Sequence, residues 1–207
     1  MTDPSAGRLF VIAAPSGAGK TSLVKALLER KPRLAVSVSH TTRAPRPNEV
    51  DGREYHFVSP AAFGDLVRAD GFLEHARVFD NHYGTGRREL EAQLATGCDV
   101  ILEIDWQGAR QVRQARPGTV SIFILPPSRE ALRERLETRQ TDSPVVIQRR
   151  LAEARSDMSH YAEFDFVVVN DSFEETLREL GLILDGNGDA FRAERPALRP
   201  VLANLLA

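Results

Sequence analysis

Four short apolar runs stand out along the chain, at residues 9–13, 100–104, 120–125 and 166–169. None shows the alternation of apolar and polar residues that marks a half-exposed strand, so each is typical of a strand buried on both faces of a parallel sheet. Helical patterns separate most of these runs. Alternating strands and helices predict an α/β fold whose ligands bind at the carboxyl ends of the strands.

Residues 35–90 break this pattern. Short strand-like segments occur at 35–39, 55–58 and 73–79, and a polar, proline-rich stretch separates the first two. Ser59 and Pro60 open a short helix that we expect to reach about Asp70, because proline suits the first helical turn. We interpret this region as a small antiparallel insertion on the main sheet, the alternative being an irregular surface excursion.

The C-terminal third is largely helical in pattern. Ser128 caps a first helix, the sequence breaks near 140–142, and Ser143-Pro144 starts a second helix with apolar residues at helical spacing. A further amphipathic helix is predicted at 173–185. We expect the tail from Gly186 onward to be loosely attached, ending in a short helix at 201–206.

Composition narrows the functional classes. The chain has 207 residues, 42% of them hydrophobic, and a net charge of −2, which provides no overall field for nucleic acid or a membrane surface. Its single cysteine, Cys98, cannot form an internal disulfide. The sequence has no apolar stretch of membrane-spanning length and no signal-peptide core. We therefore expect a soluble, cytoplasmic protein.

The run at 9–13 leads directly into a glycine-rich loop and an amphipathic helix. Two glycines let backbone N–H groups turn inward around phosphate oxygens, Lys20 can reach the terminal phosphates, and the Thr21 hydroxyl can bind Mg²⁺. The helix that follows directs its positive end at the same place. We therefore predict a nucleoside triphosphate site. Its cofactor-binding residues are Ala14, Pro15, Ser16, Gly17, Ala18, Gly19, Lys20 and Thr21.

The insertion is rich in groups that suit a small phosphorylated partner. Arg43 and Arg46 lie in a rigid Arg-Ala-Pro-Arg unit, and their forked donors can grip a phosphate. Tyr55 and Tyr83 add hydroxyl donors. A solvated basic loop is the alternative for two arginines alone. The phosphate loop favours an acceptor site instead, because a kinase needs one.

Acidic residues supply a second set of candidates. Glu74 interrupts an apolar strand, and its carboxylate can accept two hydrogen bonds from a guanine base, or it can be an exposed edge-strand residue. Thr85 or Glu103 could also contact the base. Glu103 and Asp105 point to the same side of a strand. Such acids can hold the Mg²⁺ water shell or orient the acceptor, and Asp105 can also cap a helix.

Basic residues follow near the predicted break. Arg135 and Arg139 share a helix face, and Arg149 and Arg150 follow the break. Arginines on a closing flap can neutralise the charge that develops during phosphoryl transfer, while the flap expels water. A solvated basic face that pairs with nearby acids is the alternative. At the end of the last strand, Asn170 and Asp171 are placed to contact the adenine side of the donor.

Taken together, these motifs resemble those of bacterial guanylate kinases, in the same order and over about residues 8–185. The stretches that carry the resemblance are 14–21, Ser37 to Arg46, Glu49 to Gly52, Tyr55, Phe72 to Glu74, Tyr83 to Thr85, Ile104 to Gly108, Pro126 to Ser128 and Val169 to Asp171. The resemblance implies phosphoryl transfer from ATP to GMP with Mg²⁺. It implies a P-loop NTPase-like parallel sheet core, an inserted small mixed α/β GMP-binding domain and a helical lid.

The resemblance also assigns residues and domains. It places the core at 1–35 and 91–190 with a lid at about 137–148, the GMP-binding insertion at 36–90 and a tail at 191–207. The implied catalytic residues are Lys20, Arg43, Asp105, Arg135, Arg139 and Arg150. The implied GMP-site residues are Ser39, Arg43, Arg46, Tyr55, Glu74, Tyr83, Thr85, Glu103 and Asp105. The chain departs from the family pattern at Ala14, Glu103 and Gln140, where glycine, aspartate and glycine are usual.

Two other functions remain open on sequence alone. Some guanylate-kinase-like domains of scaffold proteins bind partners without catalysis, but that class lacks the loop lysine or the lid arginines that this chain keeps. A related kinase could use another phosphate acceptor, such as a ribosyl bisphosphate, although Tyr55, Glu74 and Tyr83 favour a nucleotide base.

Overall fold

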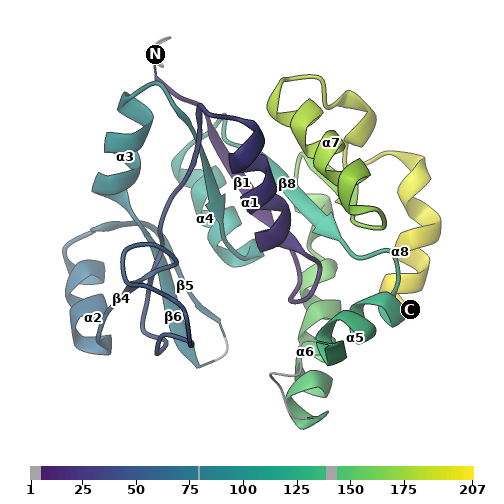
Figure 1. Ribbon diagram of the computed structural model, residues 1–207, viewed down its shortest axis with the longest axis horizontal. Helices are drawn as coiled ribbons and strands as arrows, with labels where there is room; N and C mark the ends of the chain where they lie inside the picture. Colours follow the sequence, from purple (N-terminus) through teal and green to yellow (C-terminus); the bar gives the residue numbers. More distant parts are fainter. Residues whose placement is uncertain (1–5, 79, 139–143) are drawn as a thin grey trace. The chain divides into compact units, whose positions relative to one another are not determined.

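The larger of two sheets has the strand order β2-β7-β1-β8-β9 in the computed structural model, which describes residues 6–78, 80–138 and 144–207 (Figure 1). The pairs β2–β7 and β8–β9 are parallel. The four apolar runs all form strands of this sheet, as predicted. The strands are β1 (Leu9–Ala13), β2 (Leu34–Val36), β7 (Asp99–Glu103), β8 (Val120–Leu125) and β9 (Phe166–Val169).

The chain divides into two compact units. The first comprises residues 1–10, 32–102 and 107–119, and the second comprises 11–31, 103–106 and 120–207. The division into core, insertion, lid and tail that the sequence suggested stays a prediction, and the centre of the expected lid, 139–143, lies outside the described residues.

A four-stranded sheet, ordered β4-β3-β6-β5, organises the first unit. The pairs β3–β6 and β5–β6 are antiparallel, as expected for the insertion, whereas β3–β4 is parallel. The segment at 35–39 was misplaced, because Leu34–Val36 pairs with β7 in the larger sheet. The strands are β3 (His40–Thr41), β4 (His56–Phe57), β5 (Phe72–Val78) and β6 (Asn81–Gly86).

Helices complete the first unit. The Ser59 side chain accepts a hydrogen bond from the Ala62 backbone N–H, so Ser59 caps the helix that it was predicted to start. The Phe63 ring on this helix packs against Phe72 of β5, with ring centroids 4.6 Å apart. The helices are α2 (Pro60–Arg68), α3 (Arg87–Ala95) and α4 (Trp106–Ala115), whose first residue belongs to the second unit.

The second unit places helices around β8 and β9. Helix α1 packs against α7, and the Ser128 hydroxyl caps α5 by accepting from the Ala131 backbone N–H, as predicted. The helices are α1 (Lys20–Arg30), α5 (Arg129–Thr138), α6 (Pro144–Met158), α7 (Phe173–Leu184) and α8 (Arg199–Leu206), with single 3₁₀ turns at Tyr161–Glu163, Asp189–Phe191 and Pro196–Leu198.

The C-terminal tail is not loosely attached. Helix α8, which was expected at 201–206, contacts α6, and the side chains of Leu198 and Leu205 are buried. Arg129 and Arg155 donate hydrogen bonds to the backbone carbonyls of Ala207 and Leu206, at 2.9 and 3.0 Å. The polar composition of the tail concealed these two leucines, and burying them against neighbouring helices provides the attachment.

Candidate functional site

The loop between β1 and α1 has the backbone that a phosphate cradle requires. Gly17 and Gly19 have φ angles of +91° and +94°, which are strained for any residue with a side chain. The first helical residue is Lys20, so the helix N-terminus opens directly onto the loop. Among the described residues other than glycine, only Asn48 and Asp70 have positive φ. Ala14 therefore has a negative φ angle, so alanine can replace the glycine that is usual at this position without backbone strain.

Two side chains at the start of α1 meet the end of β7. Lys20 Nζ donates to the carbonyl of Ile104 at 3.1 Å, and Thr21 Oγ1 donates to Glu103 Oε2 at 3.1 Å. A hydroxyl and a carboxylate at this separation are hard oxygen ligands of the type that Mg²⁺ prefers. The contact of Glu103 with a base, and its place in the GMP site that the resemblance implies, stay predictions.

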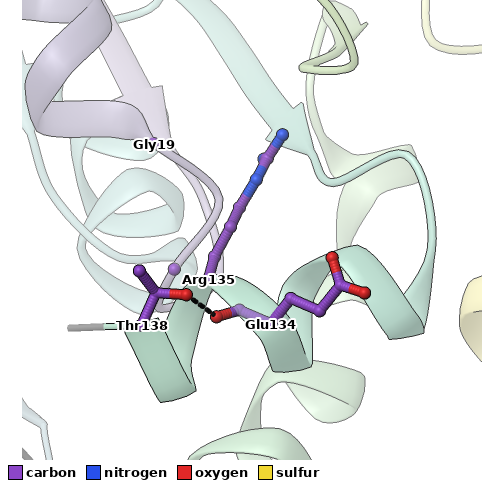
Figure 2. Close-up of a pocket in the computed structure, with 5 residues that line it drawn as sticks. Gly19, Glu134, Arg135 and Thr138 are labelled. Carbon is purple, nitrogen blue, oxygen red and sulfur yellow. Dashed lines mark hydrogen bonds between the residues drawn. The ribbon is translucent and has the colours of Figure 1, made fainter. Parts of the chain in front are cut away.

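Arg135 of α5 lies beside the phosphate loop. Its Nη2 donates to the carbonyl of Asn170 at 2.8 Å, while its Nη1 is buried without a partner among residues 6–78, 80–138 and 144–207. A pocket of about 410 Å³ opens here. Figure 2 shows Arg135 and Glu134 pointing in different directions from α5. The residues that line the pocket are Gly17, Gly19, Glu134, Arg135 and Thr138.

Two further arginines, Arg139 and Arg150, were expected to act from the lid. Arg139 lies outside the described residues, as does Gln140. Arg150 lies on α6, and its neighbour Arg149 pairs with Glu153 on the same helix at 3.0 Å. The catalytic roles of Arg139 and Arg150 therefore stay predictions.

Asn170 is tied to the phosphate loop. Its side chain is 5% exposed, and its Nδ2 donates to the carbonyl of Ala18 at 2.7 Å. In the sequence, Asn170 was indicated by its position directly after a buried strand and by the Val169 to Asp171 motif, and neither signal revealed this partner. Asp171 is exposed, and its backbone N–H bonds the carbonyl of Val169. Contact of either residue with adenine stays a prediction.

A basic and aromatic group gathers in the first unit. Arg43 Nη2 pairs with Glu49 Oε1 at 2.9 Å, and its guanidinium carbon lies 5.4 Å from the centre of the Tyr55 ring. Tyr55 and Tyr83 meet edge to face at 5.8 Å. The structure therefore brings together three of the four expected phosphate-binding residues, namely Arg43, Tyr55 and Tyr83. The fourth, Arg46, is three positions after Arg43 in the sequence, and its side chain is exposed.

Glu49 organises this group, a role that its inclusion in the family motif did not specify. While Oε1 bonds Arg43, Oε2 accepts the Arg46 backbone N–H at 2.7 Å. The hydrogen bond from Arg43 lowers the pKa of Glu49. Burial alone would lower the pKa of Arg43, but pairing with Glu49 outweighs it, and the pKa of Arg43 is raised. Both charges are therefore held in place near neutral pH.

Glu74 is buried, although β5 is an edge strand. Its side chain is 3% exposed, and its Oε1 accepts a hydrogen bond from Thr85 Oγ1 at 2.6 Å. Glu74 shares the buried face of β5 with Ala76, while His75 and Arg77 are exposed, and the register shift between Phe72 and Glu74 accompanies the burial of all three residues 72–74. The alternative of an exposed edge residue is excluded. Ser39, another expected GMP-site residue, is also buried in this unit.

A further cluster lies next to Asp105 in the chain and was not foreseen. Trp106 Nε1 donates to Asp157 Oδ1 at 3.1 Å, and the Trp106 ring stacks on His160 at 3.5 Å. His160 in turn contacts Glu163 at 2.7 Å. Burial raises the pKa of Asp157 to about 6, opposed by the hydrogen bond from Trp106 and increased by the charge of Asp105. These residues come from the start of α4 and from the end of α6 with the turn after it.

Among the described residues, no helix is long and apolar enough to cross a membrane.

Comparison with known families identifies a match over most of the chain. A family model described as guanylate kinase matches residues 6–187. A guanylate kinase of Alkalilimnicola ehrlichii is 57% identical over 200 residues, covering 97% of this chain and 98% of that protein. A guanylate kinase of Methylococcus capsulatus is 56% identical over 200 residues, with the same coverage of both chains.

A solved guanylate kinase structure is also similar to this chain over nearly its whole length. The crystal structure of guanylate kinase from Anaplasma phagocytophilum superposes with a TM-score of 0.74 and 35% identity, covering 98% of this chain and 97% of that one. The α/β fold with a parallel sheet core is therefore that of a P-loop NTPase-like kinase.

Proposed function

We propose that this chain, which belongs to the guanylate kinase family, transfers the terminal phosphoryl group of ATP to GMP and forms ADP and GDP. The observation that carries the proposal is the loop with positive φ angles at Gly17 and Gly19, followed at once by Lys20 at a helix N-terminus. This combination binds the phosphates of a nucleoside triphosphate.

The donor phosphates bind to the loop at 14–21. Backbone N–H groups cradle them, and Lys20 exchanges its bond with the Ile104 carbonyl for the terminal phosphates. The Nη1 of Arg135, which is buried and has no partner in the described part of the chain, supports a place for this arginine beside the same phosphates. An anion at that point would satisfy a donor that is otherwise orphaned.

Mg²⁺ accompanies ATP in this proposal. Thr21 and Glu103 would hold it, since their oxygens lie together at the mouth of the loop and suit a hard divalent cation. When bound, the ion neutralises charge on the phosphate oxygens of the donor.

GMP binds to the first unit. Arg43, Arg46 and the two tyrosines hold its phosphate, and the pairing of Arg43 with Glu49 supports a guanidinium that is already oriented. Glu74 accepts hydrogen bonds from guanine N1–H and the 2-amino group, with Thr85 fixing the carboxylate and Ser39 nearby in the same unit. Adenine offers no such pair of donors, so this carboxylate selects guanine.

The chemistry needs little beyond positioning and charge. Phosphoryl transfer spreads charge over the oxygens of the moving group, and the positive groups Lys20, Arg135, Arg139 and Arg150 neutralise it, while Asp105 orients the acceptor. No side chain forms a covalent intermediate, so transfer is direct and in line.

The test is a coupled assay of ADP formation from ATP and Mg²⁺, run separately with GMP, AMP, CMP and UMP. Turnover with GMP alone is the expected result. No turnover with any of the four, alongside intact ATP binding, would refute GMP as acceptor and favour a kinase with another phosphate acceptor. Loss of ATP binding as well would favour a non-catalytic binding domain.

A further inference from the structure

Asn170 makes two contacts that have nothing to do with a nucleotide base. Its side-chain nitrogen donates to the carbonyl of Ala18, 152 positions earlier in the chain, and its own carbonyl accepts from Arg135 Nη2. Because a carbonyl can only accept, the atom that faces Ala18 must be the amide nitrogen. One residue thus joins the phosphate loop to the arginine beside it.

The position of Asn170 is itself tightly held. Its backbone N–H donates to the Leu125 carbonyl at 2.8 Å, which extends the β8–β9 pairing by one residue. Its side chain is 5% exposed, and Ala18 is fully buried. Burial and the backbone bond to Leu125 therefore restrict the amide, which bonds the loop at Ala18.

Gly19 supplies independent evidence for a close fit. A Cβ at this position would collide with the Asn170 amide nitrogen, so the amide occupies the space that a side chain would need. Gly19 is also the last residue before α1, with φ of +94°. The amide therefore packs against the turn whose N–H groups face the phosphates.

We propose that Asn170 is a positioning residue for triphosphate binding, which holds the loop at 17–19 and Arg135 in one arrangement through its amide and its carbonyl. The inference rests on the proposed function in taking this loop as the ATP phosphate site. It predicts that Asn170 affects the affinity for phosphates themselves. A residue that contacts adenine would affect only ligands that carry the base.

Asn170→Asp tests the amide with almost no change in shape. The carboxylate cannot donate to the Ala18 carbonyl and repels it, so the loop populates its binding arrangement for less of the time. The backbone carbonyl that bonds Arg135 is unchanged. Asn170→Ala removes the amide without adding charge and serves if the aspartate variant folds poorly. Asn187→Asp is the matched control, because it replaces the same amide with a carboxylate at an exposed position of this unit.

The measurement is calorimetric binding of inorganic tripolyphosphate, and of ATP, to the full-length protein and these variants, with GMP binding as a check on the first unit. We expect both Asn170 variants to lose about tenfold or more in affinity for tripolyphosphate and for ATP alike. Affinity for GMP should be unchanged, and KM for ATP should rise more than kcat falls. The control should match the parent.

Unchanged tripolyphosphate affinity with weakened ATP binding would overturn the inference and return Asn170 to an adenine contact. Unchanged affinity for both ligands would overturn it as well. The binding assay needs no turnover, so it remains informative if the GMP kinase assay fails in the parent protein. Conversely, normal GMP kinase activity in the parent with unaltered tripolyphosphate binding in the variants would refute only the role of Asn170.

Discussion

The indole nitrogen of Trp106 donates a hydrogen bond to the carboxylate of Asp157, 51 positions further along the chain. Trp106 directly follows Asp105, a residue expected to orient the acceptor, and Asp157 lies near the end of α6, the helix that carries Arg150. The contact thus ties one predicted functional segment of the second unit to another. The strength of the hydrogen bond between Trp106 and Asp157 depends on whether the carboxyl of Asp157 is charged.

The stability of the protein should fall as this carboxyl loses its proton. The folded-state pKa of Asp157 is raised from 3.8 to about 6, chiefly by burial. The stabilisation that comes from proton binding at this carboxyl is therefore fully present below pH 3.8 and is lost as pH rises through about 6. Asp157→Asn keeps an acceptor for Trp106 but stays neutral. We expect the variant to gain about 1–2 kcal/mol relative to the parent between pH 4 and 7, allowing for partial solvent exposure.

Urea unfolding of both proteins across that pH range measures the difference. Trp106→Phe provides a second comparison, because the indole hydrogen bond favours the charged carboxylate. Its removal should raise the pKa of Asp157 further, so the loss of stability should extend to higher pH. Parallel pH profiles for the parent and Asp157→Asn would contradict the prediction.

Removing the lysine of the phosphate loop should abolish most turnover. Lys20→Ala deletes a positive group that we place on the terminal phosphates, and we expect kcat to fall about 10²–10³-fold. Its bond to the Ile104 carbonyl is partly buried, so the free energy of unfolding should fall by only about 1 kcal/mol. Lys25→Ala, an exposed lysine on the same helix, is the control and should turn over normally. Near-normal turnover of Lys20→Ala would refute its role.

Selection of guanine should depend on the charge of Glu74. Glu74→Gln keeps the shape but replaces one acceptor oxygen with a donor, so KM for GMP should rise about 10–100-fold, with KM for ATP unchanged. Inosine monophosphate lacks the 2-amino group, and we expect the preference for GMP over it to shrink in the variant. Steady-state kinetics with both acceptors measure this, and Glu54→Gln, an exposed acid of the same unit, is the control.

Binding of the GMP phosphate should require a guanidinium at Arg43. Arg43→Lys keeps the charge but loses the fork that pairs with Glu49 and the flat face that lies over Tyr55. We expect KM for GMP to rise at least about tenfold and KM for ATP to stay the same. The exposed Arg53, changed to lysine, should have no effect on either constant. Equal effects on both substrates would argue against a phosphate contact in the GMP site.

The Mg²⁺ concentration that the enzyme needs should depend on the Thr21 hydroxyl. EDTA should abolish turnover of the parent, and added Mg²⁺ should restore it. Thr21→Val keeps the shape without the hydroxyl, so half-maximal activity should need at least about tenfold more Mg²⁺. Ser22→Ala removes the neighbouring exposed hydroxyl and should leave the Mg²⁺ titration unchanged. A Thr21→Val titration identical to that of the parent would contradict the assignment.

Some elements were predictable because their causes are local. A run of four to six apolar residues between polar segments needs no distant partner to indicate a buried strand, and four such runs became strands of the larger sheet. The strand-like segment at 35–39 was interpreted as part of the insertion, but Leu34–Val36 pairs with β7 in the larger sheet. Such a short segment can pair with either sheet, and only its register with β7 decides between them.

Other features depend on residues far apart in the chain. Glu74 is buried on the face of β5 where Thr85 of the next strand bonds it, and the residues around Glu74 in the sequence do not reveal that partner. The tail was misjudged for the same reason, because Leu198 and Leu205 are buried only once other helices cover them. Burial is a property of the neighbours that a residue acquires, so local composition predicts it poorly.

The sequence by itself determined the phosphate loop, the parallel sheet core and the family. Glycines, lysine and threonine at fixed spacing specify backbone conformation and donor groups within eight residues. Only the tertiary structure decided what holds that loop and its neighbours in place: Asn170 against Ala18, Arg135 against Asn170, and Trp106 against Asp157. These contacts arise when strand ends and helix ends converge, and that convergence depends on the packing of the whole unit.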